Sequence, residues 1–245
     1  MKLQIFVLLF ISNTCFAQDE ILVAAASDLK FAMDSIISVF EQSNRGKVKV
    51  TYGSSGKLTE QISNGGPFHV FFSADISYPE QLKAKGFASS EVYSYAKGHL
   101  VIWSKNIDTK KGMNVLKDPS IKKIAIANPA HAPYGKRAME SIAYYKLTDV
   151  KSKIVMGSNI SQTAQFVSTG AADIGIIALS LALSPNMQKE KGNYYIIPEQ
   201  SHQPIIQGAV ITAKGKGNKL ASDFFEFVKN EKTILILNHF GFTKP

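Results

Sequence analysis

Cysteine is almost absent from this chain of 245 residues, since it has a single one, Cys15. A lone thiol cannot form an internal disulfide, and it cannot supply the paired thiolates of a structural zinc site. The five histidines are far apart in the sequence and show no His-x-x-x-His spacing: His69, His99, His131, His202 and His239. The sequence therefore predicts neither a resident metal nor any other cofactor.

Long apolar runs and long basic runs are also missing. The clearest apolar run, residues 3–11, is too short to cross a bilayer as a permanent helix. The net charge is +9, but the lysines occur in separate pairs such as Lys110-Lys111 and Lys122-Lys123. Because nucleic-acid binding requires a clustered basic surface, no nucleic-acid partner is predicted.

The N-terminal segment is typical of a secretory signal peptide. Lys2 precedes the apolar run, and Cys15 and Ala17 place small side chains just before a cleavage site after residue 17. Residues 1–17 are therefore predicted to be removed during export. The remaining chain has no cysteine, so we expect its hydrophobic core alone to stabilise it.

Strand-like and helix-like segments alternate along the rest of the chain. Apolar or alternating stretches predict strands at residues 21–26, 48–52, 70–72, 100–103, 124–127, 153–156, 174–177 and 209–212. Segments with helical spacing follow several of them, and the last, marked by Leu220, Phe224 and Val228, is close to the C-terminus. This alternation indicates an α/β fold with mainly parallel sheets.

Four of the predicted strand-to-helix junctions carry small, hydroxyl or amide residues and no lysine or arginine. They lie at Ser27-Asp28, at Ser54-Ser55-Gly56, at residues 132–135 and at Ser158-Asn159-Ile160. A helix N-terminus presents free backbone N–H groups and a partial positive charge, so it binds anions without a cationic side chain. One such junction is explained by ordinary N-capping. Several that converge would form a cage for an oxyanion.

Five segments in this order resemble the periplasmic molybdate-binding proteins of ABC importers. They are Ala24-Ala25-Ala26-Ser27, Gly53-Ser54-Ser55-Gly56, Phe71-Phe72-Ser73-Ala74-Asp75, residues 128–135 and Phe240-Gly241-Phe242. The resemblance extends over nearly the whole chain after residue 17. It implies a two-lobed class II periplasmic binding protein fold. Each lobe would be a mainly parallel sheet flanked by helices, and two hinge strands would join the lobes.

The resemblance also implies the residues that hold the anion. These are the hydroxyl and N–H groups of Ser27 and Ser55, together with the backbone N–H groups of Tyr134 and Ile160. Some members of the family add a tyrosine hydroxyl from a later strand, where this chain has Ala178. One of the family's donors is therefore either missing or replaced by another group.

Lobe boundaries and partners follow from the same resemblance. Residues 18–96 and 208–245 would form the first lobe, and residues 97–207 the second. Strands near residues 97–100 and 207–209 would act as the hinge about which the lobes close. The resemblance implies a monomeric periplasmic protein without enzymatic activity, which delivers molybdate, with tungstate as a close competitor, to a membrane permease.

Two alternatives remain open at this stage. The first is a binding protein for another tetrahedral oxyanion, such as sulfate or phosphate. The second is a serine hydrolase, because Ser54 and Lys57 fit the Ser-x-x-Lys pattern in which lysine helps to activate serine. The later Ser-Asp-Asn and Lys-Thr-Gly motifs of such enzymes are absent from the sequence.

Overall fold

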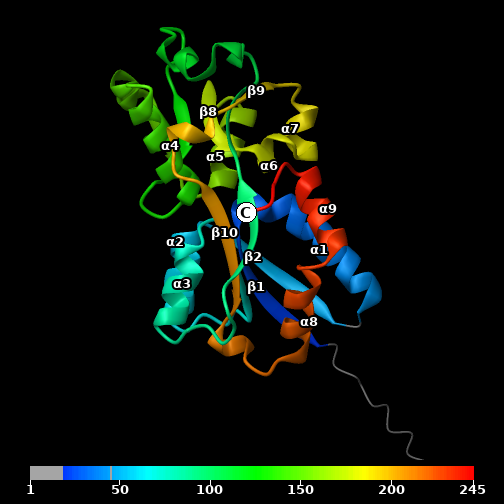
Figure 1. The fold of residues 1–245 in the computed structure, drawn as a ribbon. Coiled ribbons are helices and arrows are strands. Elements are labelled where there is room, and N and C mark those ends of the chain that lie inside the picture. The colour runs from blue at the N-terminus through cyan, green and yellow to red at the C-terminus, as the bar shows by residue number, and fades with distance from the viewer. Residues whose placement is uncertain (1–18, 45) are drawn as a thin grey trace, which may run out of the picture.

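Two five-stranded sheets, each flanked by helices, make up the protein (Figure 1). The structure is a computed structural model that describes residues 19–44 and 46–245. The predicted signal peptide, residues 1–17, lies outside the described residues. Among the residues described, no helix has the length and apolar character that crossing a membrane requires.

The strands of the first sheet have the order β2-β1-β3-β10-β4, and those of the second have the order β7-β6-β8-β5-β9. The first five strands are β1 Glu20–Ala26, β2 Lys47–Gly53, β3 Val70–Ser73, β4 Tyr93–Gly98 and β5 Leu100–Ser104. The others are β6 Ile124–Ala127, β7 Ile154–Gly157, β8 Ile174–Ala178, β9 Asn193–Ile196 and β10 Ile205–Ile211.

Both sheets have the same mixed arrangement. In the first, β1 is parallel to β2 and β3, and β10 is antiparallel to β3 and β4. In the second, β6 is parallel to β7 and β8, and β5 is antiparallel to β8 and β9. Each sheet therefore contains three parallel neighbours, whose carboxyl ends lie at one edge. The predicted α/β class is confirmed.

Helices cover both sheets. Those after the strands of the first sheet are α1 Lys30–Ser43, α2 Ser55–Ser63, α3 Ser77–Ala84, α8 Lys219–Phe227 and α9 Glu231–His239. Those of the second sheet are α4 Pro133–Tyr144, α5 Ile160–Ser168, α6 Leu179–Ala182 and α7 Pro185–Lys189. Short 3₁₀ segments are η1 Ser27–Leu29, η2 Thr109–Lys117, η3 Thr148–Lys153, η4 Glu199–Ser201 and η5 Ala213–Gly215.

The first sheet has an apolar core on each face, because successive side chains of a strand point to opposite sides. In β3, Val70 and Phe72 pack in the core that contains residues of α1 and α8, whereas Phe71 packs with residues of α2 and α3. Figure 1 shows α2 and α3 on one side of this sheet and α1, α8 and α9 on the other. The second sheet forms a separate large core, which includes the fully buried Trp103.

The chain passes between the two sheets twice. It leaves the first sheet through β4, continues through His99 into β5, and returns between the end of β9 and the start of β10. Strand β10 runs from the region of the second sheet into the first (Figure 1) and pairs with β4 from Ile205 onward. Segments β4–β5 and β10 therefore connect the two halves.

Several element boundaries differ from the sequence-based predictions. Ser27 and Asp28 do not open the first α-helix, since they form the 3₁₀ turn η1 and α1 begins at Lys30. The predicted C-terminal helix is followed by a second one, because Asn230 caps α9 through a hydrogen bond from the backbone N–H of Thr233. The helical segments α3 and η2 were not predicted, because their apolar residues follow neither the helical nor the strand spacing clearly.

The core of the first sheet depends on an aromatic cluster around Phe224, which is fully buried. Its ring makes edge contacts with Phe40 at 5.1 Å and with Phe72 at 6.1 Å between centroids. Phe224→Ala is expected to lower the free energy of unfolding by about 3–5 kcal/mol, because it removes buried area and leaves a cavity. Urea denaturation measures this loss. Leu235→Ala, at a side chain that is 61% exposed, should change stability by less than about 0.5 kcal/mol.

Candidate oxyanion-binding site

A small cavity lies where the four predicted junctions meet. Its lining consists of Ala26, Ser27, Asp28, Gly53, Ser54, Ser55, Ala74, Ala132, Pro133, Tyr134 and Ile160. The structure thus brings together all four residues predicted for the site, Ser27, Ser55, Tyr134 and Ile160. Their role as anion ligands remains a prediction.

The topology of the two sheets explains why the junctions meet. Ser27 follows the carboxyl end of β1, and Ser54 and Ser55 follow that of β2. Tyr134 and Ile160 begin the helices that follow β6 and β7 of the second sheet. Ligand sites in open α/β sheets form outside the carboxyl ends of parallel strands. Here two such edges face the same cavity.

Backbone N–H groups are the most regular donors in this cavity. Ser55 and Ile160 are the first residues of α2 and α5, and Tyr134 is the second residue of α4. The first N–H groups of a helix have no acceptor within it. In the described part of the chain, none of these three N–H groups has another hydrogen-bond acceptor. Three helix N-termini therefore direct unused donors and partial positive charge toward one space.

Local sequence fixes the orientation of two of these helices. Pro133 stands at the start of α4, where the missing N–H costs no helical hydrogen bond. Gly135 allows α4 to pack on the strand end, because a Cβ atom there would lie 2.0 Å from the carbonyl oxygen of Ala127. In α5, Asn159 Oδ1 accepts from the N–H of Gln162 at 2.9 Å, and Gln162 Oε1 accepts from the N–H of Ser158 at 2.6 Å. The predicted capping pair of Asn159 and Gln162 is present.

Three serine hydroxyls add side-chain donors to the cavity lining. Ser55 Oγ accepts a hydrogen bond from the N–H of Ala74 at 3.0 Å, so its own proton is free to donate. Ser27 Oγ accepts from the N–H of Ser161 at 3.4 Å and is likewise free to donate. Ser54 Oγ is buried and has no partner within the described residues. A ligand with several acceptor oxygens would satisfy all three hydroxyls.

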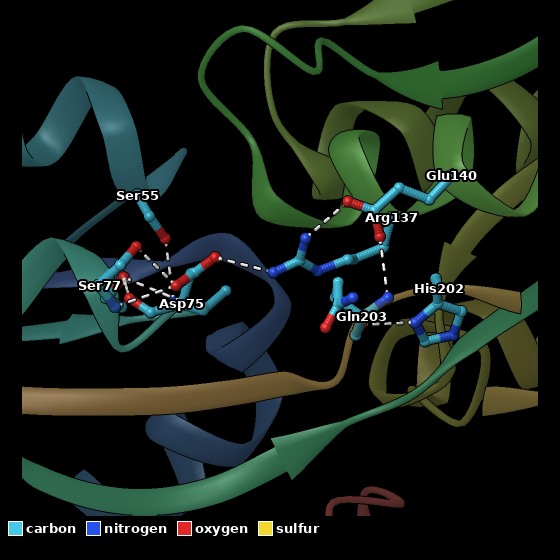
Figure 2. A network of polar contacts seen from close by, with 9 residues as sticks. Ser55, Asp75, Ser77, Arg137, Glu140, His202 and Gln203 are labelled. Carbon is cyan, nitrogen blue, oxygen red and sulfur yellow. Dashed lines mark hydrogen bonds and ion pairs between the residues drawn. The ribbon is translucent and has the colours of Figure 1, made fainter. Parts of the chain in front are cut away.

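No lysine, arginine or histidine is part of the lining formed by the described residues. Arg137, one turn after Tyr134, directs its guanidinium to carboxylates: Nη2 lies 3.3 Å from Asp75 Oδ2, and Nη1 lies 2.7 Å from Glu140 Oε1 (Figure 2). Glu140 in turn accepts from the N–H of Gln203 at 2.9 Å. Two carboxylates therefore neutralise the charge of Arg137 outside the cavity. The groups that would attract an anion inside it are the partial positive charges at the helix N-termini.

Hydrogen bonds between the two halves surround the cavity. The N–H of Gly56 donates to the carbonyl of His131 at 2.9 Å, and Ser161 Oγ donates to the carbonyl of Ser27 at 2.8 Å. Ser180 Oγ donates to the carbonyl of Asp28 at 2.8 Å. Together with the pair Arg137–Asp75 in Figure 2, these contacts hold α4, α5 and α6 against the strand ends of the first sheet.

Asp28 is the only carboxyl group in the lining formed by the described residues, and it is 1% exposed. Burial raises the pKa of its carboxyl from 3.8 to about 6, because burial penalises the charged form. Gln207 donates from Nε2 to Asp28 Oδ2 at 2.6 Å, which opposes this rise but does not cancel it. An acidic group thus belongs to the lining of a cavity whose other polar groups are mainly hydrogen-bond donors.

A buried polar network extends from Asp28 to the connecting strands. Gln207 of β10 lies 3.1 Å from the hydroxyl of Tyr134 through Nε2, and its Oε1 accepts from the hydroxyl of Tyr95 in β4 at 2.5 Å. Burial, reinforced by the nearby Asp28 carboxylate, raises the pKa of both tyrosines well above the ordinary value. Both phenols therefore stay neutral and act only as hydrogen-bonding groups.

Other residues considered from the sequence lie outside the cavity lining. Ala178 is fully buried at the end of β8 and does not contribute to the cavity. His69 Nδ1 accepts from the N–H of Leu22 at 2.9 Å, a local bond as expected for a histidine without a binding role. Lys57 is exposed, and Ser54 Oγ has no partner among the described residues, so a paired Ser54 and Lys57 does not occur. Within residues 19–44 and 46–245, no cluster of three metal-ligating side chains is present.

Sequence reasoning missed the side chains of Asp28, Gln207 and Arg137. Asp28 was treated as a helix-opening residue because it follows Ser27. Gln207 gave a usable signal, since an amide in the apolar segment Ile205–Ile211 is rarely buried without a specific partner. The pairing of Arg137 with Asp75 joins residues far apart in the sequence and had no local signal.

Comparisons with known proteins agree with the geometry. The family of bacterial extracellular solute-binding proteins matches residues 21–243. The chain is 38% identical to the molybdate-binding protein ModA of Azotobacter vinelandii over 93% of this chain and 92% of that protein. It is 30% identical to ModA of Rhodobacter capsulatus over 92% of this chain and 89% of that one.

A solved structure gives the same assignment. The periplasmic molybdate-binding protein of Azotobacter vinelandii superimposes with a TM-score of 0.85 and 31% sequence identity, covering 92% of this chain and 99% of that structure. These relatives are binding proteins and not enzymes, which agrees with the prediction of no catalytic activity. The serine hydrolase alternative is therefore set aside.

The raised pKa of Asp28 predicts a pH-dependent change in stability. The folded pKa of about 6 exceeds the unfolded value of 3.8, so the folded protein binds more protons between these values and loses stability as pH rises through them. Asp28→Asn mimics the neutral acid and should remove this loss. The ligand-free variant should gain up to about 3 kcal/mol over wild type above pH 7, and almost nothing near pH 4. Urea unfolding across this pH range measures the difference.

Asp34→Asn is the matched control for this measurement. It changes a carboxyl on α1 that is 49% exposed and that pairs with Lys30 at 3.0 Å. The control should not show a gain that grows between pH 4 and pH 7. An equal pH dependence of stability in wild type and in Asp28→Asn would contradict the assignment of a buried, destabilising carboxylate.

Proposed function

We propose that this chain, which belongs to the family of bacterial extracellular solute-binding proteins, binds molybdate and delivers it to the permease of an ABC importer. Tungstate is proposed as a close competitor. The observation that carries the proposal is the cavity itself: three helix N-termini and three serine hydroxyls surround it, and no cationic side chain of the described residues lines it. Neutral donors of this kind bind oxyanions in dry sites without buried countercharges.

The placement of the donors suits a tetrahedral ligand. Ser27 and Ser55 approach from the first sheet, whereas Tyr134 and Ile160 approach from the second. Donors from four different elements surround the cavity, so each oxygen of a tetrahedral anion has donors near it. A planar anion would leave part of this set unused, and buried unused donors are costly.

The two halves are proposed to act as lobes that close over the anion. The first lobe comprises residues 18–96 and 208–245, and the second comprises residues 97–207. Segments β4–β5 and β10 are proposed as the hinge, since the chain crosses between the sheets there. The contacts around the cavity, including Gly56 to His131, support closure, because they join the rims of the two lobes.

Export and location complete the proposal. The signal-peptide pattern of residues 1–17 and the relatives' periplasmic location support a periplasmic protein that acts as a monomer. The absence of cysteine after residue 17 fits such a protein, since its folding in an oxidising compartment would require no disulfide.

Anion selectivity tests the proposal directly. Calorimetric titration of the ligand-stripped protein with molybdate, tungstate, sulfate and phosphate at fixed salt should show tight binding of the first two. Sulfate should bind about a hundred-fold more weakly, because donors fixed on rigid helix ends would meet a smaller anion at stretched distances. Sulfate binding within about tenfold of molybdate, or 1.4 kcal/mol, would show that cage size is not the selector.

The serine hydroxyls provide a second test. A hydrogen bond to a charged group contributes roughly 1.5–3 kcal/mol, so Ser27→Ala and Ser55→Ala should each weaken molybdate binding about ten- to a hundred-fold. Binding should persist at this reduced level because the backbone donors remain. Ser168→Ala, at the far end of α5, is the matched control and should bind like wild type. Wild-type affinity in both site variants would exclude these serines from the site.

A further inference from the structure

A carboxyl group, that of Asp28, is unexpected in the lining of a cavity that is proposed to bind an anion. Asp28 is buried and contributes to the same cavity lining as Ser27 and the first residues of α4. An ionised carboxylate there would repel a bound oxyanion, and no lysine or arginine of the described residues lines the cavity to offset this repulsion. Either Asp28 weakens binding, or it binds the anion in its neutral form.

The two oxygens of Asp28 have different surroundings. Oδ2 accepts from Gln207 Nε2 at 2.6 Å. The Tyr134 hydroxyl and the N–H groups of Asp28 and Leu29 also lie near enough to stabilise the carboxylate. Oδ1 is nevertheless buried and forms no hydrogen bond of normal geometry with a described residue. Gln207 is itself oriented, since its Oε1 accepts from the hydroxyl of Tyr95 at 2.5 Å and its Nε2 is thereby directed to Asp28. The network assigns Oδ2 as the acceptor. It leaves Oδ1 as the oxygen that can carry a proton.

We propose that Asp28 binds the oxyanion as a neutral carboxylic acid, with the Oδ1–H group donating a hydrogen bond to an anion oxygen. Anion binding then takes up one proton from solvent, which converts the carboxylate of Asp28 to the acid. This inference rests on the proposed oxyanion-binding function and adds a proton-linked specificity residue to it. The neutral acid removes the repulsion and supplies a hydrogen-bond donor to an anion oxygen.

Among the described residues, none of the groups that face Asp28 titrates near neutral pH, so a pH effect in this range is assigned to Asp28 itself. Tyr134 of α4 and Tyr95 of β4 stay neutral, because burial and the carboxylate raise their pKa values. Gln207 of β10 and Ser180 of α6, which contact Asp28, do not ionise in this range. Neither does Ser161 of α5, which contacts the neighbouring Ser27. Lys30, two residues after Asp28 at the start of α1, forms its ion pair with the exposed Asp34.

The direction of the pH effect follows from these contacts. Burial already raises the pKa of Asp28 to about 6 in the ligand-free protein. A bound dianion raises this pKa further, because it repels the carboxylate and accepts from the acid. Binding is therefore strongest below about pH 6. It weakens as pH rises toward the higher pKa of the complex.

The test is calorimetric titration of ligand-stripped wild-type protein with sodium molybdate between pH 6.5 and pH 8.5. Each pH is measured in two buffers that differ in ionisation enthalpy, so that the proton count is obtained with the affinity. Wild type should take up close to one proton per molybdate. Its affinity should fall up to about tenfold for each pH unit, as expected for uptake of one proton.

Variants at two aspartates separate this role from general effects of pH. Asp28→Asn keeps a neutral donor at all pH values, so its affinity should be nearly constant across the range, without proton uptake. Asp34→Asn, which changes an exposed carboxyl on the adjacent helix, should keep the proton uptake of wild type. Thermal unfolding would show whether each variant is folded. The number of protons taken up by wild type tests the proposal even if a variant does not fold.

The outcomes distinguish this inference from the function on which it rests. Molybdate binding without proton uptake in wild type, or with full uptake in Asp28→Asn, would overturn the role of Asp28 and leave the binding function intact. No binding of molybdate or tungstate at any pH would overturn the proposed function, and the role of Asp28 with it.

Discussion

Unpaired backbone N–H groups at the starts of three helices are the constraint on which this site depends. Buried donors without acceptors are costly, and α2, α4 and α5 direct such donors toward one cavity. The arrangement is a consequence of two mixed sheets, in each of which the carboxyl ends of the parallel strands face the same cavity. A ligand that supplies many acceptor oxygens, as in the proposed function, would satisfy donors from both halves at once and would stabilise their contact.

The connecting strands are linked to the same cavity through close packing. A Cβ atom at Gly98 would lie 2.1 Å from the Tyr134 hydroxyl, so glycine at the end of β4 allows this tyrosine to approach Gln207. Gln207 of β10 then reaches Asp28 in the cavity wall. One short chain of side chains therefore joins both crossing segments to the site. If the halves move as proposed, these contacts would couple that movement to the position of the Asp28 carboxyl.

Sequence reasoning was most successful where the information is local. The strand-to-helix junctions, the proline at the start of α4 and the capping pair of α5 involve residues within a few positions of one another. It was least successful where side chains from distant segments meet: Asp28 and Gln207 are 179 positions apart, and Arg137 and Asp75 are 62 apart. Such pairings depend on how the two sheets are placed, which periodicity and turn residues do not specify.

Backbone and side-chain donors have different consequences for specificity. The N–H groups of Ser55, Tyr134 and Ile160 persist whatever side chain stands at these positions, so under the proposed function they would bind oxyanions in general. The hydroxyl of Ser54 and the Oδ1 atom of Asp28 are buried without partners in the described protein, and each imposes a condition on the ligand. The hydroxyl can donate or accept, but the buried carboxyl must first be neutral to donate. In the proposed function, selectivity would therefore depend on the protonation state of Asp28 as well as on the size of the cage.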